Sequence, residues 1–294
     1  MFFRRTLMVL AGAVWLSLPV AAAETTVTAR RKAAVPLPEP AEKRVYKEAG
    51  GMELQIWIWK PADWKPSDRR PAMVFYHGGA WRAGSPSAFS RQSAKLAERG
   101  MVALSVQYRL TSQPGVTIAE CVKDARSAFR WVRAQAAELG IDPSRLAAGG
   151  GSAGGHLAAT LATLAGPDEA GDDLRVPLQP AALVLFNPAL QLNSPRAAEA
   201  AGLPDVAALR AFSPFQHVAK GHPPTLILHG EADTTVPIAG ARAYAARVTD
   251  LGGRCEVVGY PDQPHSFFNK SPYVERTQER MEQFLAELGW IPKP

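Results

Sequence analysis

The feature that most constrains the fold is a series of short apolar runs, each bounded by Gly, Pro or Asp. These runs are AMVFYH, MVALSVQY, RLAAGG, AALVLFNP, PTLILHG and CEVVGYP. Such runs are typical of strands that are buried on both faces of a parallel sheet. The stretch MELQIWIWK predicts one more strand, because Leu54, Ile56 and Ile58 alternate with the residues between them at a period of two.

Helical stretches are expected between these runs, at residues 87–99, 117–139, 155–165, 238–251 and 274–288. In 117–139 the apolar residues recur at spacings of three and four, which places them on one face. Strand and helix alternate to the end of the sequence without a repeat or a second change of composition. The predicted fold class is therefore α/β, with a single three-layer domain over residues 45–294, a mostly parallel sheet and right-handed crossovers.

One segment, at about residues 191–224, breaks this alternation. It is rich in Pro, Ala and Ser and is longer than an ordinary connection. Two interpretations stay open. It is either a surface excursion with a short helix near 205–212 or a small lid over a pocket, because long insertions in compact domains often serve function.

The first residues have the pattern of an export signal. Arg4 and Arg5 precede an apolar segment at 7–20 and the small residues of 21–23. We therefore expect a signal peptide over 1–23 and a periplasmic or secreted protein, by general or twin-arginine export. Residues 24–44 contain three prolines among charges, which predicts an extended linker. No other segment is long and apolar enough to cross a bilayer, so no stable membrane span is expected after cleavage.

The net charge of +6 does not indicate a nucleic-acid partner. Arg4 and Arg5 supply two of these charges and residues 24–44 a net two more, so only +2 remains from Val45 onward. A nucleic-acid-binding surface needs Lys and Arg clustered on the folded part. The two cysteines, Cys121 and Cys255, are expected to be buried free thiols, although an oxidising compartment would also permit a bridge.

The stretch GGSAG at 150–154 places a serine in a Gly-x-Ser-x-Gly pattern. It follows the predicted strand RLAA and opens a predicted helix. In that setting a strained turn lifts the serine hydroxyl above the sheet, which predicts that Ser152 is a nucleophile. The amide of Ala153, at the helix N-terminus, would then point to the place where an oxyanion forms.

A serine nucleophile needs a base, and the base needs a carboxylate that orients it. In this topology the two partners follow the serine in the order acid and then histidine, at the ends of later strands. Asp233 follows the strand PTLILHG, and Glu231 and Asp262 are its rivals. His265 follows the last strand and is the expected base. The other histidines are expected to be structural or at the surface: His77, His156, His217, His222 and His229.

The stretch HGGAW at 77–81 follows an early strand and predicts the rest of the oxyanion hole. Residues with small side chains let backbone N–H groups approach a developing alkoxide, and one such donor contributes about 3–4 kcal/mol to the transition state. Gly79 and Ala80 are the expected donors, and Gly78 shapes the turn.

The motifs HGGAW, GGSAGGH, PPTLILHGEADTTVP and PHSFFN, in this order, resemble those of the α/β-hydrolase esterases. The chain looks most similar to the secreted carbohydrate-esterase and feruloyl-esterase branch, with the hormone-sensitive-lipase-like and formamidase branches nearby. The resemblance implies an α/β-hydrolase fold and a serine esterase without cofactor or metal. It implies a triad of Ser152, Asp233 and His265, and an oxyanion hole of Gly79, Ala80 and Ala153.

Two residues depart from the lipase-like pattern. Ala80 replaces the third glycine of its oxyanion motif, and Gly151 stands where that branch usually has Asp. Both departures favour the carbohydrate-esterase branch, and neither removes a backbone donor.

The expected activity is removal of short acyl groups, acetyl or feruloyl, from a small-molecule or polysaccharide ester. Trp81, Tyr108 and Phe267 follow predicted strands and are candidates for the pocket lining, although aromatic residues at such positions belong to the core as often. A lipase-like carboxylesterase and an amide hydrolase of the formamidase or peptidase type remain open. So does a non-catalytic binding protein, because fold does not determine function. The oligomeric state does not follow from the sequence.

Overall fold

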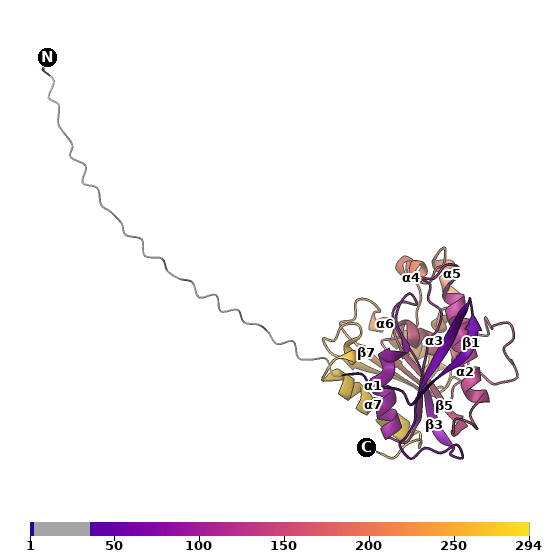
Figure 1. The fold of residues 1–294 in the computed structure, drawn as a ribbon. Coiled ribbons are helices and arrows are strands. Elements are labelled where there is room, and N and C mark those ends of the chain that lie inside the picture. Colours follow the sequence, from indigo (N-terminus) through magenta and orange to yellow (C-terminus); the bar gives the residue numbers. More distant parts are fainter. Residues whose placement is uncertain (3–35, 294) are drawn as a thin grey trace. The chain divides into compact units, whose positions relative to one another are not determined.

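Eight strands form one sheet at the centre of the computed structural model, which describes residues 1–2 and 36–293 (Figure 1). The order across the sheet is β1-β2-β4-β3-β5-β6-β7-β8. The strands β1 and β2, and β2 and β4, pair antiparallel, and all later pairs are parallel. The bounds are β1 Glu42–Ala49, β2 Met52–Trp59, β3 Arg70–Tyr76, β4 Val102–Val106, β5 Ile141–Gly151, β6 Leu183–Phe186, β7 Thr225–Gly230 and β8 Cys255–Tyr260.

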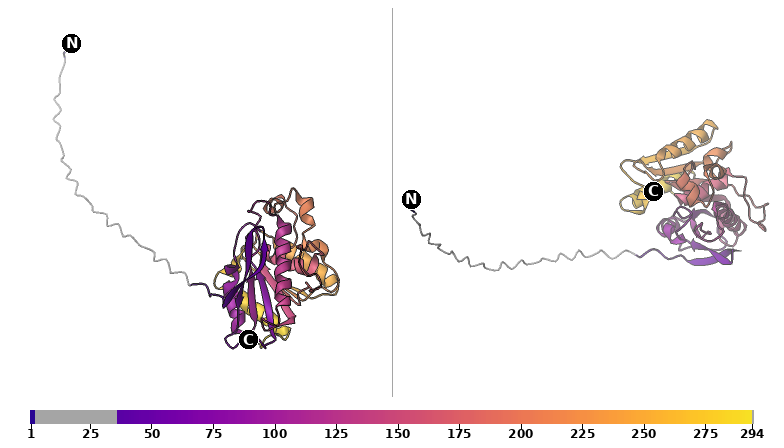
Figure 2. Two further views of the ribbon diagram at one scale, coloured as in Figure 1. Left: turned by 45° about the vertical axis from the view of Figure 1, so that its right-hand side comes forward. Right: turned by 90° about the horizontal axis from the view of Figure 1, so that it is seen from above.

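Helices cover both faces of this sheet (Figure 2). Apolar side chains fill the space between the layers. The helices α2, α3 and α6 pack against one face, and α1 and α7 pack against the other. This is the three-layer α/β architecture that the alternation of strands and helices predicted, and it agrees with the α/β-hydrolase fold that the resemblance of the motifs implied. The helices are α1 Ser90–Glu98, α2 Ile118–Ala134, α3 Ala153–Thr163, α4 Pro195–Ala200, α5 Val206–Arg210, α6 Ile238–Asp250 and α7 Tyr273–Glu287, with the 3-10 turns η1 Pro86–Phe89, η2 Pro214–His217 and η3 Phe267–Asn269.

The strands differ in burial as their position in the sheet requires. All five residues of the central β4 are buried. In β2, next to the sheet edge, Leu54, Ile56 and Ile58 are fully buried, and the two residues between them are partly exposed. The last residue of the strand, Trp59, is buried as well. Five of the six apolar runs therefore correspond to strands covered on two faces, and the alternating stretch corresponds to one covered on one face. The expectation is wrong for CEVVGYP, because it forms the edge strand β8 and all six of its residues are partly exposed.

The first strand begins earlier than the sequence patterns indicated. Strand β1 begins at Glu42, inside the segment 24–44 that was expected to be a linker, so the boundary at residue 45 is corrected. Its sequence, EKRVYKEA, consists mostly of charged residues and has no alternation of apolar residues. Charged side chains are common on edge strands, where they discourage pairing with another chain, and they conceal the strand pattern. Except for residues 1–2 and 36–44, the expected signal peptide and linker lie outside the described residues.

The insertion at 191–224 holds two short helices and a turn. Helix α5 lies where a short helix was expected, and α4 is an addition. Both begin at a residue whose side chain accepts a backbone N–H, Ser194 for α4 and Asp205 for α5. Such capping makes a short helix stable where the sequence has little apolar periodicity.

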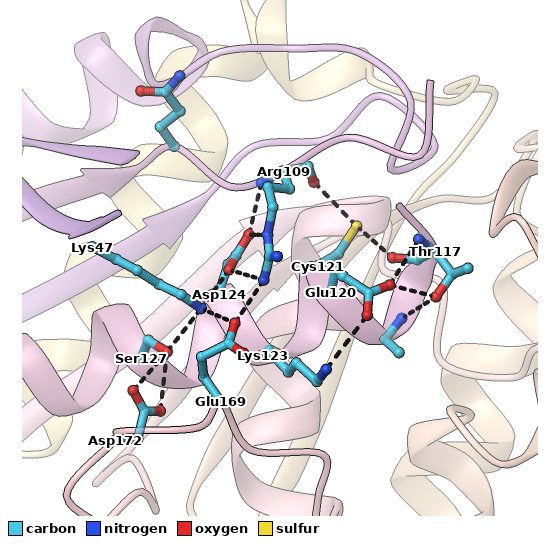
Figure 3. Close-up of polar contacts among 12 residues, drawn as sticks. Lys47, Arg109, Thr117, Glu120, Cys121, Lys123, Asp124, Ser127, Glu169 and Asp172 are labelled. Atoms are coloured by element: carbon cyan, nitrogen blue, oxygen red, sulfur yellow. Dashed lines mark hydrogen bonds and ion pairs between the residues drawn. The ribbon is translucent and has the colours of Figure 1, made fainter. Parts of the chain in front are cut away.

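A buried group of charges attaches α2 to β1 and to the loop after α3 (Figure 3). Asp124, on α2, is fully buried and accepts hydrogen bonds from the Arg109 guanidinium at 2.7 and 2.8 Å and from Lys47 Nζ at 2.7 Å. Glu169 pairs with the same two cations. Buried charges are tolerated when they are paired in this way, and we refer to these four residues as the charge cluster.

Neither of the two cysteines takes part in a disulfide bond. Cys121 is buried and Cys255 is partly buried, and both are free thiols. Burial raises the pKa of the Cys255 thiol to about 12, and it raises the pKa of Cys121 as well. Across the described residues, no helix has the length and apolarity needed to span a membrane.

Candidate active site

Ser152 occupies a strained turn between β5 and α3. Its φ is 53° and its ψ is −116°, a conformation that non-glycine residues rarely adopt. The turn is possible because glycine, which has no side chain, stands at 150, 151 and 154. A Cβ at Gly154 would lie 1.9 Å from the carbonyl oxygen of Tyr76, and one at Gly150 would lie 2.5 Å from the same atom. The glycine cluster is therefore required for close packing against β3, and this packing raises the serine above the sheet edge.

The structure brings Ser152, His265 and Asp233 into one hydrogen-bonded chain. His265 Nε2 lies 2.9 Å from Ser152 Oγ, and His265 Nδ1 lies 2.6 Å from Asp233 Oδ2. The three residues come from loops after β5, β7 and β8, which are parallel, so their carboxyl ends share one edge of the sheet. Such a chain lets the imidazole accept the serine proton while the carboxylate stabilises the resulting cation.

The carboxylate of Asp233 is held firmly in its ionised form. Its Oδ1 accepts hydrogen bonds from the amides of Thr235 at 2.9 Å and Val236 at 2.8 Å. Burial by itself raises the pKa of Asp233. The hydrogen bonds with His229, His265 and Val236 outweigh burial, however, and hold the pKa well below its usual range. An anionic carboxylate at this position fixes the proton of His265 on Nδ1.

The rival acids lie elsewhere. The Glu231 carboxylate pairs with Arg242 Nη2 at 2.8 Å, and Asp262 is exposed. A close approach explains why Asp233 is the one that reaches the histidine. A Cβ at Gly230 would lie 2.2 Å from the carbonyl oxygen of Gln263, so the loops that carry Asp233 and His265 touch where they leave the sheet.

The other five histidines have structural partners. His77 stacks on Tyr108, His156 bonds to Trp81, and His222 bonds to the hydroxyl of Tyr244. In each of the remaining two, His217 and His229, the ring nitrogen Nε2 bonds to a backbone carbonyl.

The loop after β3, residues 77–84, approaches the serine turn from the opposite side. A Cβ at Gly78 would lie 2.9 Å from the carbonyl oxygen of Gly151 and 3.4 Å from Ser152 Cβ. Gly79 and Ala80 both have positive φ, 119° and 54°, and line the same pocket as Ser152. Within the part of the chain that the structure describes, no acceptor is paired with the amides of Gly79, Ala80 or Ala153.

A pocket of about 360 Å³ opens at Ser152 and His265. Phe89, Phe268 and Ala88 form its apolar wall, and Asn187 and Thr235 add polar groups. Its full lining is Gly78, Gly79, Ala80, Ala88, Phe89, Gly151, Ser152, Asn187, Thr235, His265, Ser266, Phe268 and Asn269. All of these residues lie outside the insertion at 191–224, so the insertion does not form a wall of this pocket.

The expectation for the aromatic lining is wrong. Trp81, Tyr108 and Phe267 belong to the packed core and do not line the pocket, whereas Phe89 and Phe268, which are buried to a similar degree, do line it. Adjacent side chains of a turn point in different directions, and position in the sequence does not decide which one faces the pocket.

Asn187 is a pocket residue that the sequence patterns did not single out. It directly follows β6, and its Oδ1 accepts the amide of Ser266 at 3.2 Å, beside His265. Because it follows a parallel strand of the same sheet, a search of all strand ends would have found it. Among the described residues, no group of His, Cys, Asp or Glu side chains has the arrangement of a metal site.

Comparison with known proteins places this geometry in context. The family model described as the alpha/beta hydrolase fold matches residues 73–209, and the model of the prolyl oligopeptidase family matches residues 193–289. The esterase LipQ of Mycobacterium tuberculosis is 31% identical over 83% of this chain. The chain spans 62% of the length of that relative.

Solved structures give a fuller match. Esterase 2 of Thermogutta terrifontis is 41% identical, and the alignment covers 88% of this chain and 98% of that protein, with a TM-score of 0.82. The propionate-bound structure of the same esterase is 42% identical over 86% of this chain and 96% of that one, with a TM-score of 0.80.

Proposed function

The chain belongs to the esterases of the α/β-hydrolase superfamily, and on this basis we propose that it is a serine carboxylic-ester hydrolase. The observation that carries the proposal is the hydrogen-bonded chain Ser152–His265–Asp233 at the base of a pocket. Three residues from separate loops meet there at hydrogen-bond distances, as nucleophilic catalysis requires.

In the first half of the proposed reaction, Ser152 Oγ attacks the ester carbonyl carbon while its proton passes to His265 Nε2. The carbonyl oxygen becomes an oxyanion that accepts hydrogen bonds from the amides of Gly79, Ala80 and Ala153. The bond between the carbonyl carbon and the alcohol oxygen then breaks, and His265 gives its proton to the leaving alcohol. The product of this half is an acyl group on Ser152.

In the second half, His265 takes a proton from water, and the resulting hydroxide attacks the acyl carbonyl. The same amides stabilise the second oxyanion. The bond to Ser152 Oγ breaks, the serine recovers its proton from His265, and the carboxylic acid leaves. Asp233 stays ionised throughout and stabilises the imidazolium in both halves.

The proposed substrate is an ester with a short acyl group, acetyl or feruloyl, on a carbohydrate alcohol. The pocket volume of about 360 Å³ is near the lower end of the range for ligand pockets, roughly 300–1,000 Å³, which favours a small acyl group. The propionate-bound relative supports the same size class. The carbohydrate part of the proposal rests on the sequence resemblance, and action outside the cytoplasm rests on the export pattern of residues 1–23.

Hydrolysis of p-nitrophenyl esters of increasing acyl length, with Ser152→Ala as control, tests this proposal. We expect activity that is highest for acetyl and propionyl and absent in the variant. An optimum at long acyl chains would indicate a lipase-like esterase instead. Full activity of Ser152→Ala would refute the nucleophile. Acetylated xylan compared with a small acetyl ester then tests the carbohydrate alcohol.

Amide hydrolysis is the second candidate. The match to the prolyl oligopeptidase family over residues 193–289 favours it, because this segment holds both Asp233 and His265. Acetyl p-nitroanilide and p-nitrophenyl acetate carry the same acyl group and differ in the leaving atom. Comparison of kcat/KM for the two therefore separates an amidase from an esterase.

A further inference from the structure

The loop after β3 adopts a conformation that must be held by its surroundings. Three consecutive residues, Gly79, Ala80 and Trp81, have positive φ values of 119°, 54° and 60°. For a residue with a side chain, each such conformation costs on the order of 1–3 kcal/mol and persists only where contacts enforce it. Since this loop presents two of the proposed oxyanion donors, the contacts that enforce its shape bear directly on catalysis.

The side chain of Trp81 supplies one such contact. The indole Nε1 donates to His156 Nδ1 at 3.2 Å, and the two rings meet edge to face with centroids 5.2 Å apart. His156 Nε2 then donates to the backbone carbonyl of Phe212 at 2.8 Å. His156 is fully buried, and both of its ring nitrogens are engaged, which fixes the neutral tautomer with the proton on Nε2.

The backbone of Trp81 supplies the second contact. The amide of Thr111 donates to the carbonyl oxygen of Trp81 at 2.9 Å. The hydroxyl of the same threonine donates to the carbonyl oxygen of Ala200, at the end of α4, at 2.7 Å. Phe212 and Ala200 both belong to the insertion at 191–224. Two separate hydrogen-bonded paths therefore run from the insertion to Trp81, one to its side chain and one to its carbonyl group.

We propose that the insertion at 191–224 supports the oxyanion loop from behind, through the paths Phe212–His156–Trp81 and Ala200–Thr111–Trp81. Trp81 and His156 are then positioning residues for the oxyanion hole. This inference rests on the proposed function. It also accounts for an insertion that is packed against the domain and forms no wall of the pocket.

The physical reason is the distance dependence of oxyanion stabilisation. Donors act when they lie about 2.7–3.1 Å from the oxyanion. A displacement of about 1 Å in a catalytic group can lower the rate on the order of a hundredfold. If the Trp81 contact is lost, the loop is free to relax from its positive φ values. The loss also leaves His156 Nδ1 buried without a partner.

The variant Trp81→Phe tests the first path, because it removes the indole N–H and keeps an aromatic ring. We expect kcat for p-nitrophenyl acetate to fall about ten- to a hundredfold, with KM within about twofold. The inhibition constant of a trifluoromethyl ketone, whose hydrated or serine-bound form carries an oxyanion, should rise by a similar factor. A role limited to stability would change neither value in the folded protein.

Tyr244→Phe is the matched control. The Tyr244 hydroxyl bonds to His222 Nε2 at 2.6 Å, in the core and outside the pocket lining. This variant also removes a buried contact between an aromatic donor and a histidine, and its kcat is expected to match that of the wild type. A kcat for Trp81→Phe within twofold of this control would overturn the inference, as would a rise in KM with kcat unchanged.

Thr111→Val tests the second path and covers the case in which Trp81→Phe does not fold. It removes the bond to the carbonyl oxygen of Ala200 with little change of shape, and its control is Thr225→Val, which removes a bond to the carbonyl oxygen of Pro223. We expect kcat to fall at least about threefold in Thr111→Val alone, and equal kcat values in the two variants would count against the inference. An inactive wild type would instead remove the proposed function itself.

Discussion

The hydrogen bonds of Asp233 predict how the substitution Asp233→Asn, which replaces the carboxylate by an amide, changes the catalytic rate. Oδ1 accepts the backbone amides of Thr235 and Val236, at 2.9 and 2.8 Å. In the variant the side-chain carbonyl oxygen must occupy this place, because an NH₂ group cannot accept those bonds. The NH₂ group then faces His265 Nδ1, where Oδ2 now lies at 2.6 Å.

An NH₂ group at that position requires Nδ1 to be the acceptor, so the imidazole proton moves to Nε2. Nε2 lies 2.9 Å from Ser152 Oγ and, once protonated, cannot accept the serine proton. The equivalent change in a serine protease lowers kcat about 10⁴-fold. At about 1.4 kcal/mol for each factor of ten, this loss corresponds to about 5 kcal/mol of transition-state stabilisation.

The assay is kcat for p-nitrophenyl acetate in Asp233→Asn, with Glu231→Gln and Asp262→Asn as controls that change the rival carboxylates in the same way. We expect both controls to stay within about threefold of the wild type, because neither carboxylate contacts the histidine. Thermal unfolding of all three variants shows whether the fold is kept. The reasoning is refuted if Asp233→Asn keeps more than about a tenth of the wild-type kcat in a folded protein, or if a rival variant shows the large loss instead.

Three further predictions concern stability and are checked by urea unfolding. In the charge cluster, Asp124→Asn leaves two buried cations without their main partner and should lower the free energy of unfolding by about 3–5 kcal/mol. The control is Glu98→Gln, which changes an exposed ion pair and should lower the free energy of unfolding by less than about 1 kcal/mol. Similar losses in the two would contradict the importance of burial. In helix α3, Gly154→Ala places a Cβ 1.9 Å from a carbonyl oxygen of β3 and should prevent stable folding. The control is Gly240→Ala in α6, where the Cβ meets only an ordinary contact at 3.4 Å, and this change should raise the free energy of unfolding by up to about 1 kcal/mol. A stable Gly154→Ala would show that the turn can relax. Burial lowers the pKa of His156 from 6.5 to about 4, and it does the same for His77, so the unfolded chain binds more protons than the folded chain in that interval. The contribution of each of these residues to the free energy of unfolding should be constant above about pH 7.5 and fall by about 3 kcal/mol towards pH 4. A flat profile between pH 6.5 and 4.5 would be inconsistent with a neutral buried imidazole.

The order of strands and helices could be predicted from the sequence because it depends on local patterns. Seven of the eight strands were indicated by apolar runs or alternation, and β1 was not, because its pattern is one of charges. Ser152 could also be predicted, since the glycines around it are required by the turn itself. These features follow from backbone geometry and side-chain periodicity over a few residues, which a single sequence contains.

The choice among neighbouring residues at the site was decided only by the tertiary structure. The sequence favoured Asp233 over Glu231 by its place at the start of a loop, but only the structure shows Asp233 in contact with His265, because two loops more than thirty residues apart touch at Gly230. Phe268 rather than Phe267 lines the pocket, although both side chains pack in the same part of the core, because adjacent side chains of the turn after His265 point in different directions. The paths from the insertion to Trp81 likewise join distant segments. Such contacts depend on how loops from separate strands pack at one sheet edge. This packing joins residues far apart in the sequence, so it cannot be predicted from local sequence patterns.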